Sequence, residues 1–379
     1  MNEMHRLRPL WRALCESGEE FVLATVVTLE GSGYRKAGAR MLIAQDGRRA
    51  GTISGGCLEA EVAKKAFWHT ENGPAMRTYS THAEDGDVPY GMGCGGVIHL
   101  LLERRETAAP LLEAMDQAYD LRLGLAVATQ LSGAGVGRRC WQMEGDAGMA
   151  GSRDAQLQDK LRAAEARRKS AGVDGVFAEW MGARTGLLIV GAGNDAQPLA
   201  RAAHAMGWYV SVMDGRSNLI TRERFHEADS LQLLTPAALD GLLLRPTDAV
   251  ALMSHSLEQD RMALRSLLPR DLAYLGVLGP RSRTADMVAE LAAEAAAGKG
   301  IAGRHAELAA AWMERLHAPM GLELGGDGAE SVALSILAEM QQTLHCASGL
   351  PLRELRRNVG TPDAPVRDGV AVSRALTAS

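Results

Sequence analysis

The sequence predicts an α/β protein with two domains, and three observations support this. The chain has 379 residues, which exceeds the size at which one hydrophobic core usually stops growing. In the second half, apolar strand patterns alternate with helical ones, as in a parallel sheet covered on both faces. In the first half, short β-rich segments surround a few helical ones, which predicts a small mixed α+β domain.

The first domain is expected over residues 1–143. It opens with a short amphipathic helix at 10–16, and its longest helix is expected at 58–68 because apolar residues there share one side. An Asp46-Gly47 turn is expected to join two strands into a hairpin. Strands are predicted at 21–28, 39–44, 50–53, 97–102 and 121–129. No internal repeat is recognisable in the sequence.

The rest of the chain divides into three expected parts. Residues 144–183 are poor in large apolar side chains and are interpreted as an exposed helical connector or the edge of the first domain. Residues 184–350 are expected to form a doubly wound parallel sheet, and 351–379 a flexible tail. The strands predicted within 184–350 are 186–190, 208–213, 249–253 and 274–278, with helices near 199–206, 258–268 and 284–295.

Composition excludes several classes of protein. The net charge of −5 lacks the basic excess of a dedicated nucleic-acid binder. No apolar run is long enough to span a membrane, and the N-terminus lacks an export signal, so we expect a cytoplasmic protein. The five cysteines are odd in number and scattered, which is not the pattern of a disulfide framework.

Two of the cysteines lie inside glycine clusters. Cys57 follows Gly55 and Gly56 and opens a predicted helix, whose N-terminus would stabilise a thiolate. Cys94 lies in a similar cluster beside Gly95. Glycine allows a backbone to approach a ligand closely, and successive N–H groups in such turns bind anions. The alternative for each is a small buried thiol at a glycine-packed turn. Neither matches the paired spacing of a structural zinc site.

A dinucleotide-binding pattern opens the second domain. A buried strand at 186–190 is followed by Gly191-Ala192-Gly193-Asn194 and then by a helix, and Asp214 ends the next strand. Gly191 is expected to make the tight turn and Gly193 to admit a phosphate, while Asp214 would accept a ribose hydroxyl. Arg216, two residues after Asp214, could bind the 2′-phosphate of NADP, so both NAD and NADP stay open as ligands. The alternative is that the Rossmann fold is kept without the nucleotide.

The sequence resembles the XdhC/CoxI family of xanthine dehydrogenase accessory proteins over nearly its whole length. The resemblance is carried by the segment 30–42, which includes Arg35 and Arg40, and by the clusters around Cys57 and Cys94. It continues in the Rossmann opening at 187–196 and in the closing loop and helix at 318–339. Two positions depart from the family pattern. Asn194 stands where histidine is frequent, and Ser254-His255-Ser256 stands where Thr-His-Asp is frequent.

The resemblance implies a molybdenum cofactor chaperone rather than a catalyst. Such a protein would bind molybdopterin, in its plain or dinucleotide form, and support exchange of an oxo group for sulfur supplied by a cysteine desulfurase. It would then pass the product to an apo molybdenum hydroxylase. Cys57 and Cys94 are the expected reactive thiols. The expected cofactor-binding residues are Arg35, Arg40, Gly55, Gly56, Gly95, Gly191, Gly193, Asn194, Asp214, His255 and Arg281.

Other interpretations stay open at this point. An NAD(P)-dependent oxidoreductase would use the Rossmann domain, and a redox or metal sensor would use the two thiols. NAD(P) or another nucleotide is left open as a second ligand, and a homodimer is left open as the assembly. His255 is equally a ligand contact or a satisfied loop histidine, and Arg281 is either a phosphate ligand or a solvated surface charge. Neither nucleic acid nor membrane is expected as a partner.

Overall fold

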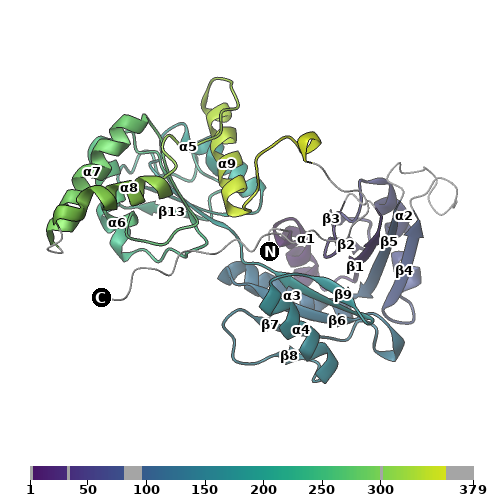
Figure 1. Cartoon of the computed structure of the whole chain (residues 1–379). Helices are drawn as coiled ribbons and strands as arrows, with labels where there is room; N and C mark the ends of the chain where they lie inside the picture. The colour runs from purple at the N-terminus through teal and green to yellow at the C-terminus, as the bar shows by residue number, and fades with distance from the viewer. Residues whose placement is uncertain (1–2, 32–34, 81–95, 299–301, 356–379) are drawn as a thin grey trace. The chain divides into compact units, whose positions relative to one another are not determined.

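The computed structural model describes residues 3–31, 35–80, 96–298 and 302–355. The side chain of Cys57 lies outside this description, although its backbone does not. The chain divides into two compact units, Met1–Thr185 and Gly186–Ser379 (Figure 1). Each unit is described by itself below.

The first unit contains two antiparallel sheets, which we call sheet A and sheet B. Sheet A has the strand order β3-β2-β1-β5-β4. Its strands are β1 (Phe21–Glu30), β2 (Arg40–Ala44), β3 (Arg49–Gly51), β4 (Ala75–Ser80) and β5 (Val97–Arg104). Helix α2 (Cys57–His69) covers one face, where Leu58, Val62 and Ala66 join the apolar side chains of the sheet. The predicted strands of this region are therefore present, with β4 added.

Sheet B has the order β8-β7-β6-β10-β9. Its strands are β6 (Leu125–Gln130), β7 (Arg139–Met143), β8 (Ala150–Gly151), β9 (Ala171–Val173) and β10 (Val176–Met181). Helix α4 (Ala155–Arg167) packs on one face through Leu157, Leu161 and Ala164. Most of the segment interpreted as an exposed helical connector or the edge of the first domain, 144–183, thus forms three strands of sheet B and the helix α4 that packs on it. Its pairing with β6 and β7 makes it an integral part of the first unit.

Two helices close the core between the sheets. α1 (Met4–Ser17) and α3 (Arg105–Leu121) bury one face each against side chains of both sheets, including Phe21, Leu23, Leu125 and Val127. α3 carries seven buried residues, and sequence inspection did not predict this helix.

The second unit is a parallel sheet, sheet C, in the order β13-β12-β11-β14-β15. Its strands are β11 (Gly186–Val190), β12 (Tyr209–Asp214), β13 (Ser230–Leu233), β14 (Ala249–Leu252) and β15 (Tyr274–Val277). α5 (Ala196–Ala205) and α9 (Ala329–Leu344) cover one face, where they lie side by side (Figure 1). Three helices pack on the other face of sheet C, where they form a second apolar core with it: α6 (Leu257–Leu267), α7 (Arg281–Gly298) and α8 (His305–Arg315). The predicted doubly wound α/β domain is confirmed.

Candidate functional site

The turn that carries the first cysteine is built around a carboxylate. Glu59, in the first turn of α2, accepts hydrogen bonds through Oε1 from the backbone N–H groups of Ile53 (3.1 Å) and Ser54 (2.7 Å). Its Oε2 accepts the Ser54 hydroxyl (2.5 Å) and the Gly56 N–H (3.0 Å). These hydrogen bonds to Glu59 hold together the turn formed by residues 53–56. Cys57 follows this turn and is the first residue of the helix.

The electrostatics of the turn favour negative charge. Burial by itself would raise the pKa of Glu59, but the hydrogen bonds from Ser54 and the backbone outweigh it and hold the pKa below its ordinary value of 4.5. Gly56 precedes the helix with φ of 123°, a conformation that L side chains rarely adopt, and an added Cβ would meet no heavy atom within 4 Å. The N-cap residue of the helix therefore carries no capping side chain, while the ionised Glu59 in the first turn accepts the Gly56 N–H and its own N–H and compensates part of the positive helix end.

The second cysteine motif lies outside the described residues, which omit 81–95. The roles of Cys94 and Gly95 thus stay predictions. So does the reactive role of Cys57, whose backbone position at the helix start agrees with the sequence analysis. Of the other cysteines, Cys15 and Cys346 are exposed, and Cys140 is buried in β7. Burial raises the pKa of Cys140 to about 11, so this thiol stays protonated and unreactive at neutral pH.

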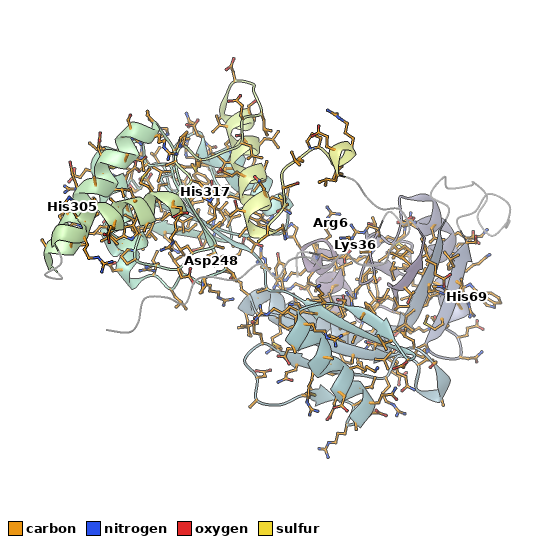
Figure 2. All side chains as sticks on the ribbon, viewed as in Figure 1. Arg6, Lys36, His69, Asp248, His305 and His317 are labelled. Carbon is orange, nitrogen blue, oxygen red and sulfur yellow. The ribbon has the colours of Figure 1, made fainter. Side chains whose placement is uncertain are left out.

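Arg35 lies beside a cavity of about 440 Å³ in the first unit. Its guanidinium forms an ion pair with Glu3, while Lys36 is exposed on the same loop (Figure 2). Glu179 and Trp180 of β10 line the opposite part of the cavity wall. Arg35 and Lys36 carry the guanidinium and ammonium groups that bind phosphates, although Glu3 offsets the charge of Arg35.

Arg40 has a different place from the one expected. Its side chain is 3% exposed, and it donates to Glu179 Oε1 (3.1 Å), Glu179 Oε2 (2.5 Å) and the carbonyl of Gly38 (2.8 Å). Burial disfavours its charge, but Glu179 outweighs this and raises the pKa of Arg40. The structure therefore places Arg40 in a buried ion pair between sheets A and B, where it is not accessible to a ligand.

Sequence reasoning did not single out Glu59 or Glu179 for a role. Glu59 stands three residues after Gly56, the spacing at which an acidic side chain reaches back to the start of a helix, so a local signal existed. Glu179 lies 139 residues from its partner Arg40, in a segment taken as a connector, and no local signal exists for such a pair.

The glycine turn of the second unit has the geometry of a Rossmann opening. Gly191 has φ of 111°, and an added Cβ would lie 2.4 Å from the carbonyl oxygen of Met253 at the end of β14. Gly193 faces the ring of His255, whose Nε2 lies 3.3 Å from Asp195 Oδ2. This is the place where the strand order of sheet C reverses, between β11 and β14, and where ligands of such sheets bind. Gly193 and His255 are thus brought together.

Asp214 is engaged within the chain. Its carboxylate is fully buried and accepts hydrogen bonds from the Ala192 N–H (2.7 Å) and from the backbone and guanidinium of Arg216 (2.8–2.9 Å). Burial would raise the pKa of Asp214, but Arg216 and the backbone bonds lower it. The acceptor predicted for a ribose hydroxyl is therefore covered by Arg216.

The two remaining predicted residues lie near the same edge of sheet C. Asn194 is exposed, and its Oδ1 accepts hydrogen bonds from Arg224 (3.1 Å) and Gln197 (3.4 Å). Arg281 is exposed at the first position of α7. Neighbouring Arg283 is instead bonded to Asp260 (3.0 Å) and the carbonyl of Leu278 (2.8 Å).

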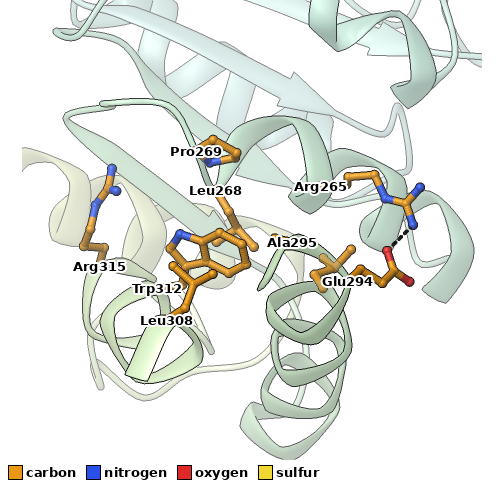
Figure 3. Close-up of a pocket in the computed structure, with 9 residues that line it drawn as sticks. Arg265, Leu268, Pro269, Glu294, Ala295, Leu308, Trp312 and Arg315 are labelled. Atoms are coloured by element: carbon orange, nitrogen blue, oxygen red, sulfur yellow. Dashed lines mark hydrogen bonds and ion pairs between the residues drawn. The ribbon is translucent and has the colours of Figure 1, made fainter. Parts of the chain in front are cut away.

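A larger cavity, of about 620 Å³, lies elsewhere in the second unit (Figure 3). It is formed between α6, α7 and α8, with Trp312 and Leu308 on one side and the Arg265–Glu294 ion pair at its rim. The predicted site residues do not line it. Within the part of the chain that the structure describes, no helix is sufficiently long and apolar to cross a membrane.

Comparisons with known proteins agree with this architecture. The sequence model of the XdhC and CoxI family matches residues 14–80, and that of the XdhC Rossmann domain matches residues 187–340. A protein of Bacillus subtilis (strain 168), described as a probable subunit of xanthine dehydrogenase, is 31% identical over 343 residues, covering 87% of this chain and 95% of that protein.

Two further similarities extend the comparison. A crystal structure of a xanthine dehydrogenase from Bacillus halodurans superposes with a TM-score of 0.73 at 27% identity, over 96% of this chain and 98% of that one. The molybdenum cofactor insertion chaperone PaoD of Escherichia coli (strain K12) is 34% identical over 110 residues, 27% of this chain and 31% of that protein. The resemblance read from the glycine–cysteine motifs is confirmed, and the chain belongs to the XdhC and CoxI family.

Proposed function

We propose that this protein binds the molybdenum cofactor as cargo and delivers it to an apo molybdenum hydroxylase of the xanthine dehydrogenase type. In this role it is a maturation factor without turnover of its own. The proposal is supported by membership of the XdhC and CoxI family and by the 34% identity to PaoD, a molybdenum cofactor insertion chaperone. We propose that it acts in the cytoplasm.

The observation that carries the proposal is the open start of α2. Gly56 offers no side chain to cap the helix, and Glu59 accepts hydrogen bonds from Ser54 and Gly56 of the turn, so we propose that the remaining N–H groups at the helix start, beside Cys57, contact the cargo. A pterin phosphate requires N–H donors of this kind, and molybdenum or a persulfide requires a soft thiolate. We propose Cys57 and Cys94 as the thiols that hold the cargo.

Sulfur supply is assigned to a partner. We propose that a cysteine desulfurase partner supplies the sulfur of the mature cofactor, so that this chain itself only binds, orients and releases the cargo. Arg35 and Lys36, which line the 440 Å³ cavity, are proposed to contact the phosphate of the plain or dinucleotide cofactor.

The Rossmann unit enters this proposal as a second binding module. An NAD-dependent oxidoreductase would need an accessible acceptor for the ribose hydroxyls, and the Asp214 carboxylate is covered by Arg216. We therefore favour a ligand with a phosphate near Arg216, such as NADP or the nucleotide part of the cofactor, over NAD. Gly193 and His255 are proposed to line its binding place.

The test is direct. The protein is purified from a molybdenum-replete host, and bound pterin is extracted, oxidised and quantified by fluorescence in its plain and dinucleotide forms. We expect stoichiometric pterin in the wild type, and loss of at least nine-tenths of it in Cys57→Ser. Cys15→Ser, which removes an exposed thiol elsewhere, is the matched control and should retain pterin. A wild-type protein without pterin, or equal retention by both variants, would overturn the proposal.

A further inference from the structure

The first unit contains the same series of elements twice. α1, β1, β2, β3, α2, β4 and β5 are followed by α3, β6, β7, β8, α4, β9 and β10, so that each series runs αβββαββ. The strand orders β3-β2-β1-β5-β4 and β8-β7-β6-β10-β9 are identical once the strands are numbered within each series. We call residues 4–104 the first copy and residues 105–181 the second copy.

Strand register establishes which residues are equivalent. In the first copy Thr25 pairs with Arg40, and in the second Thr129 pairs with Arg139. The other pairs follow the same rule: Leu23 with Glu103 matches Val127 with Glu179, and Met41 with Gly51 matches Cys140 with Gly151. Threonine, arginine, glutamate and glycine thus recur at equivalent places in both copies.

The helices that open the two copies, α1 and α3, agree in the spacing of their buried residues. The residues of α1 that are buried have buried counterparts in α3, always 104 positions later in the chain. These pairs are Met4 and Ala108, Leu7 and Leu111, Trp11 and Met115, and Leu14 and Ala118. The apolar face of a helix is set by the surface that it covers, so both helices cover equivalent surfaces.

The turn before the second strand is also repeated. Gly38 and Gly137 each stand two residues before the arginine, with φ of 93° and 84°. Gly38 donates to the carbonyl of Val26 (2.7 Å), and Gly137 donates to that of Gln130 (2.9 Å). In both cases an added Cβ would press on the glutamate of the other copy, at 2.5 Å from Glu179 Oε1 and 3.0 Å from Glu103 Oε1.

Ion pairs join the copies reciprocally. Arg40 of the first copy binds Glu179 of the second, and Arg139 of the second binds Glu103 of the first. All four side chains are at most 7% exposed. Exchanging the two copies converts one ion pair into the other, which is the property of a two-fold interface.

The apolar contact between the sheets has the same symmetry. Val27, Leu101 and Phe177 form a small buried core, with Leu131 packed against it. Leu101 and Phe177 each stand two residues before the reciprocal glutamate of their copy, and Val27 and Leu131 each stand two residues after the paired threonine. Each copy thus presents the same face to the other.

We propose that the first unit is a dimer fused into one chain, in which two copies of one αβββαββ module serve as partner subunits for each other. The surface that one copy presents is specific for a second copy of the same module. Arg40, Glu103, Arg139 and Glu179 are its paired contacts, so each copy is completed by a glutamate from the other. This inference does not depend on the cargo proposed above.

Charge reversal in the full chain tests the proposal. Arg40→Glu alone places two buried carboxylates against each other and should lower Tm by roughly 10 °C. Adding Glu179→Arg, across the copies, should restore most of the loss. Adding Glu103→Arg, within one copy, should lower Tm further, because both reciprocal pairs are then mismatched. The mirror set, Arg139→Glu with Glu103→Arg or with Glu179→Arg, should repeat this pattern.

A measurement on the unaltered chain keeps the proposal falsifiable where a reversal prevents folding. By native-state hydrogen exchange, the central strands β1 and β6 should open together, with protection factors within about tenfold of each other. The mild variants Glu103→Gln and Glu179→Gln should lower both sets of protection factors by similar amounts. Exchange of one copy at least a hundredfold faster than the other, or recovery of Tm by the reversal within one copy, would overturn the fused dimer.

Discussion

Helices α2 and α4 occupy equivalent places in the two copies of the first unit, yet they begin differently. α4 is capped by Asp154, whose Oδ1 accepts the N–H groups of Gln156 (2.9 Å) and Leu157 (3.2 Å). α2 follows Gly56, which has no side chain, and its acidic residue Glu59 bonds backward to the turn. The second copy therefore shows that this module can have a side-chain N-cap, here Asp154, at the start of this helix.

The difference shows that the fold itself does not require a glycine turn here. An aspartate cap stabilises a helix start, and a glycine with φ of 123° forgoes that gain. The first copy nevertheless keeps the open end, beside Cys57, and adds a carboxylate that fixes the open turn. We interpret the first copy as the functional one and the second as its structural partner. Four predictions test this comparison.

Loss of the carboxylate should have the largest effect. In Glu59→Gln, the NH₂ group of the amide would replace one carboxylate oxygen and face an N–H donor, either that of Ser54 or that of Gly56. Because that hydrogen bond is lost, the free energy of unfolding should fall by about 2 kcal/mol. Because the folded pKa of Glu59 lies below 4.5, its stabilisation is present above that pH and is lost as the pH falls through the folded value. Urea titrations should therefore show the two proteins converging in acid. A constant difference would contradict this.

Closing the helix should have the next largest effect. Gly56→Asp imitates Asp154, and its carboxylate would compete with a bound anion for the first N–H groups of α2. We expect pterin affinity to fall about tenfold, which equals ~1.4 kcal/mol. Gly56→Ala has the same backbone strain without the carboxylate and is the control. Equal affinities of the two variants would show that the helix end does not bind the cargo.

Opening the other helix should cost less. Asp154→Ala leaves two N–H groups of α4 without their cap, and the free energy of unfolding should fall by about 1 kcal/mol. Pterin content should not change, because Asp154 does not line the 440 Å³ cavity and lies far along the chain from Cys57. Thermal unfolding and pterin fluorescence measure the two effects on the same sample. A loss of pterin here would extend the site to the start of α4.

The smallest effect is expected at the buried thiol of the second copy. With a pKa of about 11, Cys140 should not react with iodoacetamide at pH 7.5, so Cys140→Ser should leave the rate of alkylation unchanged. Cys57→Ser should remove the fastest reacting thiol, which mass spectrometry of digested protein identifies. Labelling of Cys140 at a rate comparable to Cys57 would contradict the distinction between the copies.

Local pattern was sufficient to predict much of the fold. Strands such as β1 and β11 are continuous apolar segments, and the glycine turn after β11 has a recognised spacing, so both could be located without the structure. β8 and β9 could not, because they have two and three exposed residues and owe their conformation to pairing with β7 and β10. The segment of α4 was interpreted as an exposed connector or a domain edge because it is poor in large apolar side chains, and in the structure α4 buries only three residues.

The site residues also differ in whether their surroundings could be predicted from neighbouring residues. Gly56 and Cys57 were placed at a helix start from sequence, since glycine turns and helix starts are local features. Arg40 was taken as a ligand-binding residue because a sequence cannot show that Glu179, 139 residues away, neutralises it. Asp214 was expected to be free for a ribose, and its partner Arg216 is only two residues away, but the conformation that joins them was not predictable.

By itself the sequence determined the α/β class, the Rossmann opening, the family and the position of the first glycine–cysteine turn, because each depends on neighbouring residues. Only the tertiary structure decided that the first unit is doubled. Its copies share fold, register and a few residues such as Gly38 and Gly137, while most core positions have exchanged one apolar side chain for another. Burial constrains volume and polarity more than identity, so a repeat can persist in packing after it has faded from the sequence.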